Sequence, residues 1–162
     1  YDHLLRDDLE WAEPSKQFTE RVRDVNELIA ELLESDDAPR PAHPIERTVT
    51  YHDACHLAHA QKITAAPRRL LALIEGLNVV DLPESEMCCG AAGTYNLEQP
   101  DMARQLAERK LDHIHSTGSD LCVTANVGCA MQIESEARRL DRSLTVRHPV
   151  ELLHAAYFGA SR

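Results

Sequence analysis

Two different spacings of apolar residues divide the chain into two parts. In the first part the apolar positions recur every three or four residues, as on one face of an α-helix: Phe18, Val22, Val25, Ile29 and Leu32. Pro14 and Ser15 begin this segment and are typical of a helix start. The pattern predicts that residues 1–34 are helical.

A polar, proline-rich stretch, SDDAPRPAHP, follows and predicts a linker over 35–46. Beyond it, short runs of β-branched and apolar residues alternate with longer helical patterns. The strand patterns cover 47–51, 78–82, 121–125 and 144–148. The helical patterns cover 67–75, 99–116, 129–140 and 149–159.

This alternation predicts an α/β fold over 47–162, with a small, mainly parallel four-stranded sheet and helices on both faces. A helical lead-in segment (1–34) and the linker (35–46) precede it. Because crossovers between parallel strands are right-handed, the carboxyl ends of all four strands are expected at one edge of the sheet. Open α/β folds bind their ligands at that edge.

The composition is that of one ordinary globular domain: 162 residues, 43% hydrophobic and 27% charged. A formal net charge of −10 argues against nucleic-acid binding and against charge-driven docking on an anionic membrane. No apolar run reaches the roughly 18 residues of a membrane span, and no signal-peptide pattern is found. The chain begins at Tyr1 instead of methionine, and we expect it to be a piece of a longer protein.

Four of the five cysteines fall where the predicted fold binds ligands. Cys55 follows the first strand, Cys88 and Cys89 lie after the second, and Cys129 begins the helix after the third. Cys122 lies within the third strand and is expected in the core. Packing as small hydrophobic residues is the alternative for the four, but three separate loops rarely deliver thiols for packing alone. An odd cysteine count without a regular framework suits metal or redox chemistry in a reducing compartment.

Adjacent thiols at Cys88 and Cys89 restrict that chemistry. Consecutive Cα atoms lie about 3.8 Å apart, whereas an unstrained disulfide spans roughly 4.4–6.8 Å, so a disulfide between them would be strained. An iron–sulfur cluster offers a different iron to each thiolate, while adjacent cysteines crowd a single zinc ion. An iron–sulfur cluster is therefore favoured, with zinc and a thiol–disulfide redox pair as alternatives.

Other residues near the cysteines are candidates for supporting a cluster. Gly90 and Gly93 would let backbone N–H groups approach the cluster sulfurs. His52 and His56 stand on either side of the first loop cysteine, and His148 ends the last predicted strand at the same edge. Each histidine is a candidate hydrogen-bond donor or metal ligand, and packing or capping is its alternative role.

Four stretches together resemble a known family. YHDACHLAHAQ, CCGAAGTYN, NVGC and HPVEL are similar to the cysteine-rich CCG domain of heterodisulfide reductases and of lactate- and glycolate-oxidising systems. That family has one cysteine, a vicinal pair and then C-x-x-C. Here 32 residues separate Cys55 from Cys88, and 36 separate Cys89 from position 126. Asn126 stands where the family has the first cysteine of C-x-x-C.

The longer stretches YHDACHLAHAQKIT and GTYNLEQPDMARQLAERKL are similar to iron–sulfur subunits of glycolate oxidase, of which this chain would be the C-terminal half. The resemblance implies a non-catalytic electron-transfer part of an oxidoreductase. Electrons would pass from a flavoprotein subunit, which oxidises glycolate or a related 2-hydroxy acid, toward quinone.

The same resemblance implies a ligand set and partners. In heterodisulfide reductases the complete five-cysteine set is associated with a non-cubane cluster, and Asn126 replaces one of those cysteines here. Four thiolates suffice for an ordinary 4Fe–4S cluster, so Cys55, Cys88, Cys89 and Cys129 are the expected metal ligands. Asn126 would hydrogen-bond to the cluster or to a ligand. The implied partners are the flavoprotein subunit and the N-terminal half and ferredoxin-type domain of the full-length chain. The implied location is the cytoplasm. The alternative is a peripheral position at the inner membrane, to which the complex would attach the protein.

Overall fold

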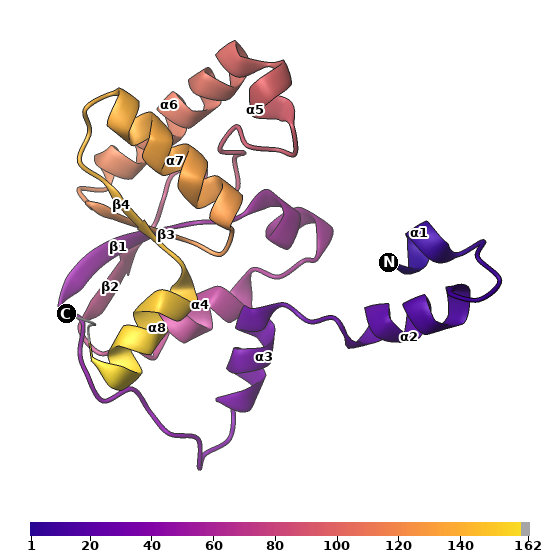
Figure 1. Cartoon of the computed structure of the whole chain (residues 1–162). Helices are drawn as coiled ribbons and strands as arrows, with labels where there is room; N and C mark the ends of the chain where they lie inside the picture. The colour runs from indigo at the N-terminus through magenta and orange to yellow at the C-terminus, as the bar shows by residue number, and fades with distance from the viewer. Residues whose placement is uncertain (160–162) are drawn as a thin grey trace.

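The computed structural model describes residues 1–159, which form one sheet with helices on both of its faces (Figure 1). The strands are β1 (Arg47–His52), β2 (Leu77–Val80), β3 (Leu121–Thr124) and β4 (Thr145–Arg147). They lie in the order β2-β1-β3-β4, and all neighbouring strands are parallel. The predicted α/β class is confirmed, and the strand ends differ from the predicted ones by one or two residues.

Two groups of helices cover the two faces of the sheet (Figure 1). One face carries α5 (Tyr95–Glu98), α6 (Pro100–Ser116) and α7 (Val127–Arg139). The other carries α3 (Val25–Leu32), α4 (Ala65–Ala72) and α8 (Pro149–Phe158). The chain leaves β1 toward one face and β3 toward the other, although these strands are neighbours. The carboxyl ends of β1 and β3 therefore flank the switch point where such sheets bind ligands.

The middle strand β3 is buried along its whole length. Cys122 lies in it opposite Thr50 of β1 and Val146 of β4, and it is 0% exposed. Burial raises the pKa of its thiol to about 12, so Cys122 is neutral near pH 7. The prediction that Cys122 packs in the core is confirmed.

The N-terminal segment forms three helices: α1 (Asp2–Leu5), α2 (Ala12–Arg21) and α3. The predicted helical segment over 1–34 is confirmed, but it is divided into three helices by non-helical stretches at 6–11 and 22–24. Val22 is extended, with φ −70° and ψ 125°, and Asp24 caps α3 by accepting the Asn26 N–H at 2.8 Å. This cap starts a new helix where the apolar spacing suggested continuation. Helices α1 and α2 lie apart from the rest of the protein, whereas α3 packs on α4 (Figure 1).

The predicted linker, 35–46, contains neither helix nor strand, and the N–H groups of Ala42 and His43 both donate to the Ala156 carbonyl of α8. Two short elements were not predicted: α5 and the π-helix η1 (His56–Ala60). Both are too short for a periodic pattern to reveal them. In the described range 1–159, no helix has the length and apolar character needed to cross a membrane.

The segment between β1 and Cys55 is anchored to α4 by a buried carboxylate. Asp53 is 4% exposed, and both of its oxygens accept hydrogen bonds from the Arg68 guanidinium at 2.6 Å. Arg68 also lies over the Tyr51 ring, 4.8 Å from its centroid. Burial, the largest single effect, would raise the pKa of Asp53, but the hydrogen bonds from Arg68 and Ser85 together with the charge of Arg68 outweigh it and hold that pKa below its ordinary value. The Asp53 carboxylate therefore anchors the loop to α4, and His52 makes its hydrogen bond with a different group.

Asp53→Asn is predicted to lower the free energy of unfolding by about 1.5–3 kcal/mol near neutral pH, because a charge-assisted hydrogen-bond pair is lost. The ionised carboxylate stabilises the fold above the ordinary carboxyl pKa, and this contribution disappears as the pH falls through the lowered pKa of Asp53. Urea unfolding from about pH 7 to about pH 2 should show the wild-type advantage shrinking in acid.

Asp101→Asn is the matched control, because Asp101 forms an exposed pair with Arg104 on the surface of α6. It should change stability little at any pH. Equal losses in the two variants would contradict the anchoring role of Asp53.

Candidate metal centre

Three loops bring four cysteines to the carboxyl edge of the sheet. Cys55 follows β1, Cys88 and Cys89 lie between β2 and α5, and Cys129 is in the first turn of α7. All are free thiols. Cys89 and Cys129 are 1% and 6% exposed, whereas Cys55 and Cys88 are half-buried. The site therefore reaches the surface on the side of Cys55 and Cys88.

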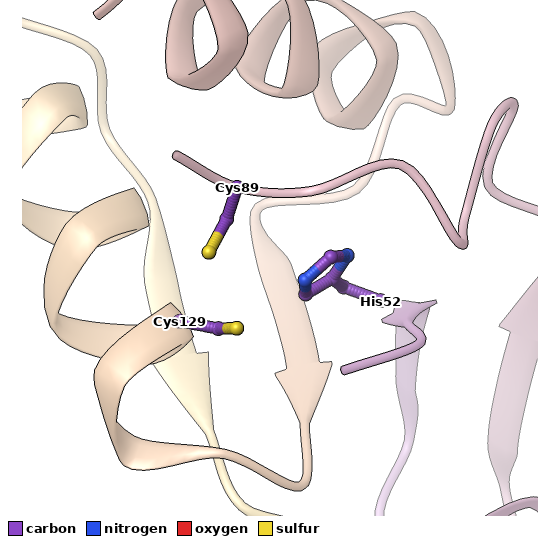
Figure 2. A group of neighbouring side chains, drawn as sticks. All are labelled: His52, Cys89 and Cys129. Atoms are coloured by element: carbon purple, nitrogen blue, oxygen red, sulfur yellow. The ribbon is translucent and has the colours of Figure 1, made fainter. Parts of the chain in front are cut away.

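A buried histidine completes the inner part of this site. A ring nitrogen of His52 and the sulfur atoms of Cys89 and Cys129 all lie within 4.8 Å of one another. Figure 2 shows the three side chains converging from three separate segments of the chain. The metal-binding residue types predicted at these positions are thus brought together, and the ligand role of each stays a prediction.

His52 presents an unpaired acceptor to the thiols. Its Nδ1 lies 2.9 Å from the Ser85 carbonyl oxygen, and since a carbonyl can only accept, Nδ1 carries the proton. In the neutral ring Nε2 is then a bare acceptor, and among the residues that the structure describes it is buried without a hydrogen-bond partner. Leaving such an acceptor unpaired costs about 1–3 kcal/mol. Nε2 is therefore suited to bind a metal or to accept a hydrogen bond from a ligand group.

The thiols have unequal pKa values. The Cys129 thiol donates to Cys89, which lowers the pKa of Cys89 against the effect of burial. The same hydrogen bond, together with burial and the neighbouring thiols Cys55 and Cys88, raises the pKa of Cys129. Burial raises the pKa of Cys88. The protein alone thus favours one thiolate, and a bound cation is needed to ionise the set.

Gly90 is fixed by its surroundings. Its φ of +94° lies in the left-handed region, and a Cβ there would stand 2.5 Å from the Ala103 carbonyl oxygen of α6. Its N–H donates to the Cys88 sulfur at 3.3 Å. Gly93 also has a positive φ, +56°, but no atom lies within 4 Å of a Cβ built on it. Gly90 contacts the sulfur of Cys88 and Gly93 supplies a turn, and the predicted contacts of both glycines with a cluster stay a prediction.

Asn126 caps α7. Its Oδ1 accepts the Cys129 backbone N–H at 2.8 Å, and its Nδ2 faces Nδ1 of His56 at 3.4 Å. Asn126 therefore orients the helical turn that carries Cys129. The contact of Asn126 with Cys129 is thus to the backbone N–H, and its predicted hydrogen bond to a cluster or to a ligand stays a prediction.

His148 lines a small cavity next to the Asn126 cap of α7. It caps α8: its Nδ1 accepts the Val150 N–H at 3.2 Å, and Glu151 accepts the His148 N–H at 2.7 Å. His148, Asn126 and Thr124 line a cavity of about 100 Å³, and burial lowers the pKa of His148. The structure thus gives His148 a capping role, the alternative stated from the sequence, and does not place it in the group around His52.

Comparison with known proteins agrees with this arrangement. The sequence profile of the cysteine-rich domain CCG matches residues 49–134, which include all four loop cysteines. The chain belongs to the CCG cysteine-rich domain family. The family predicted from the sequence is therefore confirmed.

Several curated proteins are similar to this CCG domain protein over almost its whole length. It is 30% identical over 155 residues to lactate utilization protein A of Shouchella clausii (strain KSM-K16), covering 96% of this chain and 64% of that protein. It is 34% identical over 157 residues to a Bacillus subtilis (strain 168) protein named "Probable glycolate oxidase iron-sulfur subunit", covering 94% of this chain and 34% of that protein. The chain thus spans less than two thirds of these relatives.

Two groups behind the thiols of the CCG domain were missed from the sequence. The Ser85 carbonyl oxygen accepts from the Asp53 N–H at 3.1 Å, from His52 Nδ1 at 2.9 Å and from the Lys110 ammonium at 3.3 Å. A backbone carbonyl has no sequence signature. The buried position of Lys110 could have been recognised from the sequence, because this lysine interrupts the apolar stripe of α6 formed by Ala103, Ala107, Leu111 and Ile114.

Gly90→Ala is predicted to cost more stability than Gly118→Ala. Both force a Cβ into left-handed backbone, at about 1–2 kcal/mol each. At Gly118 that Cβ has no atom within 4 Å beyond its chain neighbours in the described part of the chain, whereas at Gly90 it meets the Ala103 carbonyl, which adds about 1–3 kcal/mol. Urea unfolding of the two variants measures the difference, and equal losses would show that α6 does not constrain the CCG loop.

Asn126→Ala is predicted to lower the free energy of unfolding of the metal-free protein by about 0.5–2 kcal/mol, because the cap of α7 is lost. Asn126→Asp keeps an acceptor for the Cys129 N–H and should stay close to the wild type. Urea unfolding checks both. An Asp variant as unstable as the Ala variant would argue against the capping role.

Proposed function

We propose that this CCG domain holds a 4Fe–4S cluster and transfers electrons within a complex that oxidises a 2-hydroxy acid. The observation that carries the proposal is the convergence of Cys55, Cys88, Cys89 and Cys129 at the switch point of the sheet. Four thiolates are the usual ligand set of such a cluster.

The donor chemistry of the site supports this assignment. The adjacent thiols of Cys88 and Cys89 can bind different irons, whereas they would crowd a single ion. The Gly90 N–H on the Cys88 sulfur is a contact of the kind that supports cluster ligands. When bound, the cluster supplies a one-electron redox centre. The protein's own residues bind it, exclude water around Cys89 and Cys129, and leave the half-buried Cys55 and Cys88 on the side open to a redox partner.

The names of the relatives support the substrate class. One is named for glycolate oxidase and others for lactate utilization, and both acids are 2-hydroxy acids. We propose glycolate or a related acid as the substrate, a flavoprotein subunit as its oxidising partner, and quinone as the final acceptor. The N-terminal half and ferredoxin-type domain of a longer chain are the further proposed partners. A cytoplasmic position, with contact to the inner membrane through the complex, belongs to the same proposal.

A structural zinc site is a second candidate, favoured by one specific observation. His52, Cys89 and Cys129 offer one nitrogen and two sulfur donors within 4.8 Å of one another, a set that zinc accepts. Cys55 or Cys88 would complete a tetrahedron. In this case the domain would have a structural or binding role instead of a redox role.

Metal analysis with a visible spectrum, on protein purified without oxygen, separates these functions. The proposal predicts about four irons and four sulfides per chain, with broad absorption near about 400 nm that bleaches on reduction. About one zinc without colour would favour the second candidate. Metal-free protein with reactive thiols would instead favour a thiol–disulfide protein.

Cysteine variants test the ligand assignment. Cys88→Ser should lose most of the iron, because one ligand of the set is removed. Cys122→Ala, which removes the core thiol outside the site, should keep it. Circular dichroism checks that both variants fold. Wild-type iron content in Cys88→Ser would show that Cys88 is not a ligand.

A further inference from the structure

A fully buried lysine lies behind the thiols. Lys110 is 0% exposed and occupies a core position of α6. Lysine almost never has such a position unless it is paired, because its ammonium loses the hydration that stabilises the charge. Within residues 1–159, the hydrogen bonds of its Nζ go to two backbone carbonyls and to no carboxylate.

These carbonyls belong to the loop that leads to the vicinal cysteines. Nζ donates to the Glu84 carbonyl oxygen and to the Ser85 carbonyl oxygen, the latter at 3.3 Å. The Ser85 oxygen also accepts from His52 Nδ1 at 2.9 Å. Glu84 has a positive φ of +51°, a backbone conformation that needs support from its surroundings. Lys110 thus joins α6 to the start of the cysteine loop and, through one shared carbonyl, to His52.

The two carbonyls satisfy the hydrogen bonds of Lys110 but leave its charge unbalanced. The two nearby carboxylates are already paired, Asp53 with Arg68 and Glu84 with Arg109. Cys122 is also near, but burial keeps it a neutral thiol. Burial lowers the pKa of Lys110, while Cys89 is among the neighbours that raise it.

Among the described residues, the remaining acidic neighbour of Lys110 is the loop thiol of Cys89. A cluster on four thiolates carries the negative charge that this part of the core lacks.

We propose that Lys110 is a positioning residue for the cluster: it fixes the cysteine loop and supplies the buried positive charge that the thiolate set requires. This inference rests on the proposed function. When the cluster accepts one electron from a reductant, its negative charge grows by one, and no bond forms or breaks. A nearby cation stabilises the reduced form more than the oxidised form, so Lys110 raises the midpoint potential.

Redox titration of the anaerobically purified protein, followed by visible absorption, tests this role. Lys110→Met and Lys110→Gln should both shift the midpoint potential to more negative values, because the charge is removed. Gln is neutral but retains an N–H donor for the Glu84 and Ser85 carbonyls, so Lys110→Gln removes the charge while keeping a hydrogen bond. It also serves as the test variant if Lys110→Met does not fold. Lys110→Arg keeps the charge and should remain near the wild-type potential.

Lys16→Met is the control for net charge, because Lys16 is exposed on α2, away from the site. It should leave the potential unchanged. A second readout is the rate at which an iron chelator removes the cluster, which should rise in Lys110→Met and Lys110→Gln alone. The inference would be overturned if Lys110→Gln binds iron but has the wild-type midpoint potential and loses the cluster to the chelator at the wild-type rate. Wild-type protein that binds no iron would overturn the proposed function itself.

Discussion

The site depends on a topological constraint: β1 and β3 are adjacent and parallel, yet their connections leave toward opposite faces of the sheet. No crossover helix can then cover the point between their carboxyl ends. Cys55 leaves β1 on one side of that point and Cys129 enters α7 on the other, while the loop after β2 brings the vicinal pair across. The ion pair of Asp53 and the Asn126 cap hold the first two segments, and the contact of Gly90 with α6 holds the third.

Beneath the thiols, a small polar network enters an otherwise apolar core. Its centre is the Ser85 carbonyl, which accepts three hydrogen bonds from β1, the following loop and α6. Two features of this network are unsatisfied within residues 1–159: the buried Nε2 of His52 lacks a hydrogen-bond partner, and the Lys110 ammonium has no carboxylate bonded to it. The unpaired nitrogen suits a metal or a hydrogen-bond donor, whereas the ammonium suits a negatively charged group, and a metal cluster held by the thiolates is the proposed group that would supply both. Buried polar groups of this kind are costly unless they are completed.

Much of this architecture could be predicted from the sequence. Runs such as RTVTY and LCVTA are strongly β-forming, and their alternation with helical patterns determines which loops reach the ligand edge. The placement of Cys55, Cys88, Cys89 and Cys129 at that edge followed from this alternation alone.

Other features were concealed by the sequence pattern. The apolar spacing continues across Val22 and Val25, so it does not reveal the break that the Asp24 cap creates. The helix after β3 begins at Val127 instead of the predicted 129, and the later start concealed that Asn126 is an N-cap.

Tertiary contacts account for what the sequence could not reveal. The tautomer of His52 depends on which ring nitrogen donates to the Ser85 carbonyl. The role of Lys110 depends on its contacts with the loop packed over it.

The central claim is that four thiolates from three loops hold one iron–sulfur cluster. An anaerobic crystal structure with anomalous scattering at the iron edge tests it most directly. The account predicts a group of iron peaks within bonding distance of the sulfur atoms of Cys55, Cys88, Cys89 and Cys129. A single peak at the zinc edge, beside His52, Cys89 and Cys129, would contradict it.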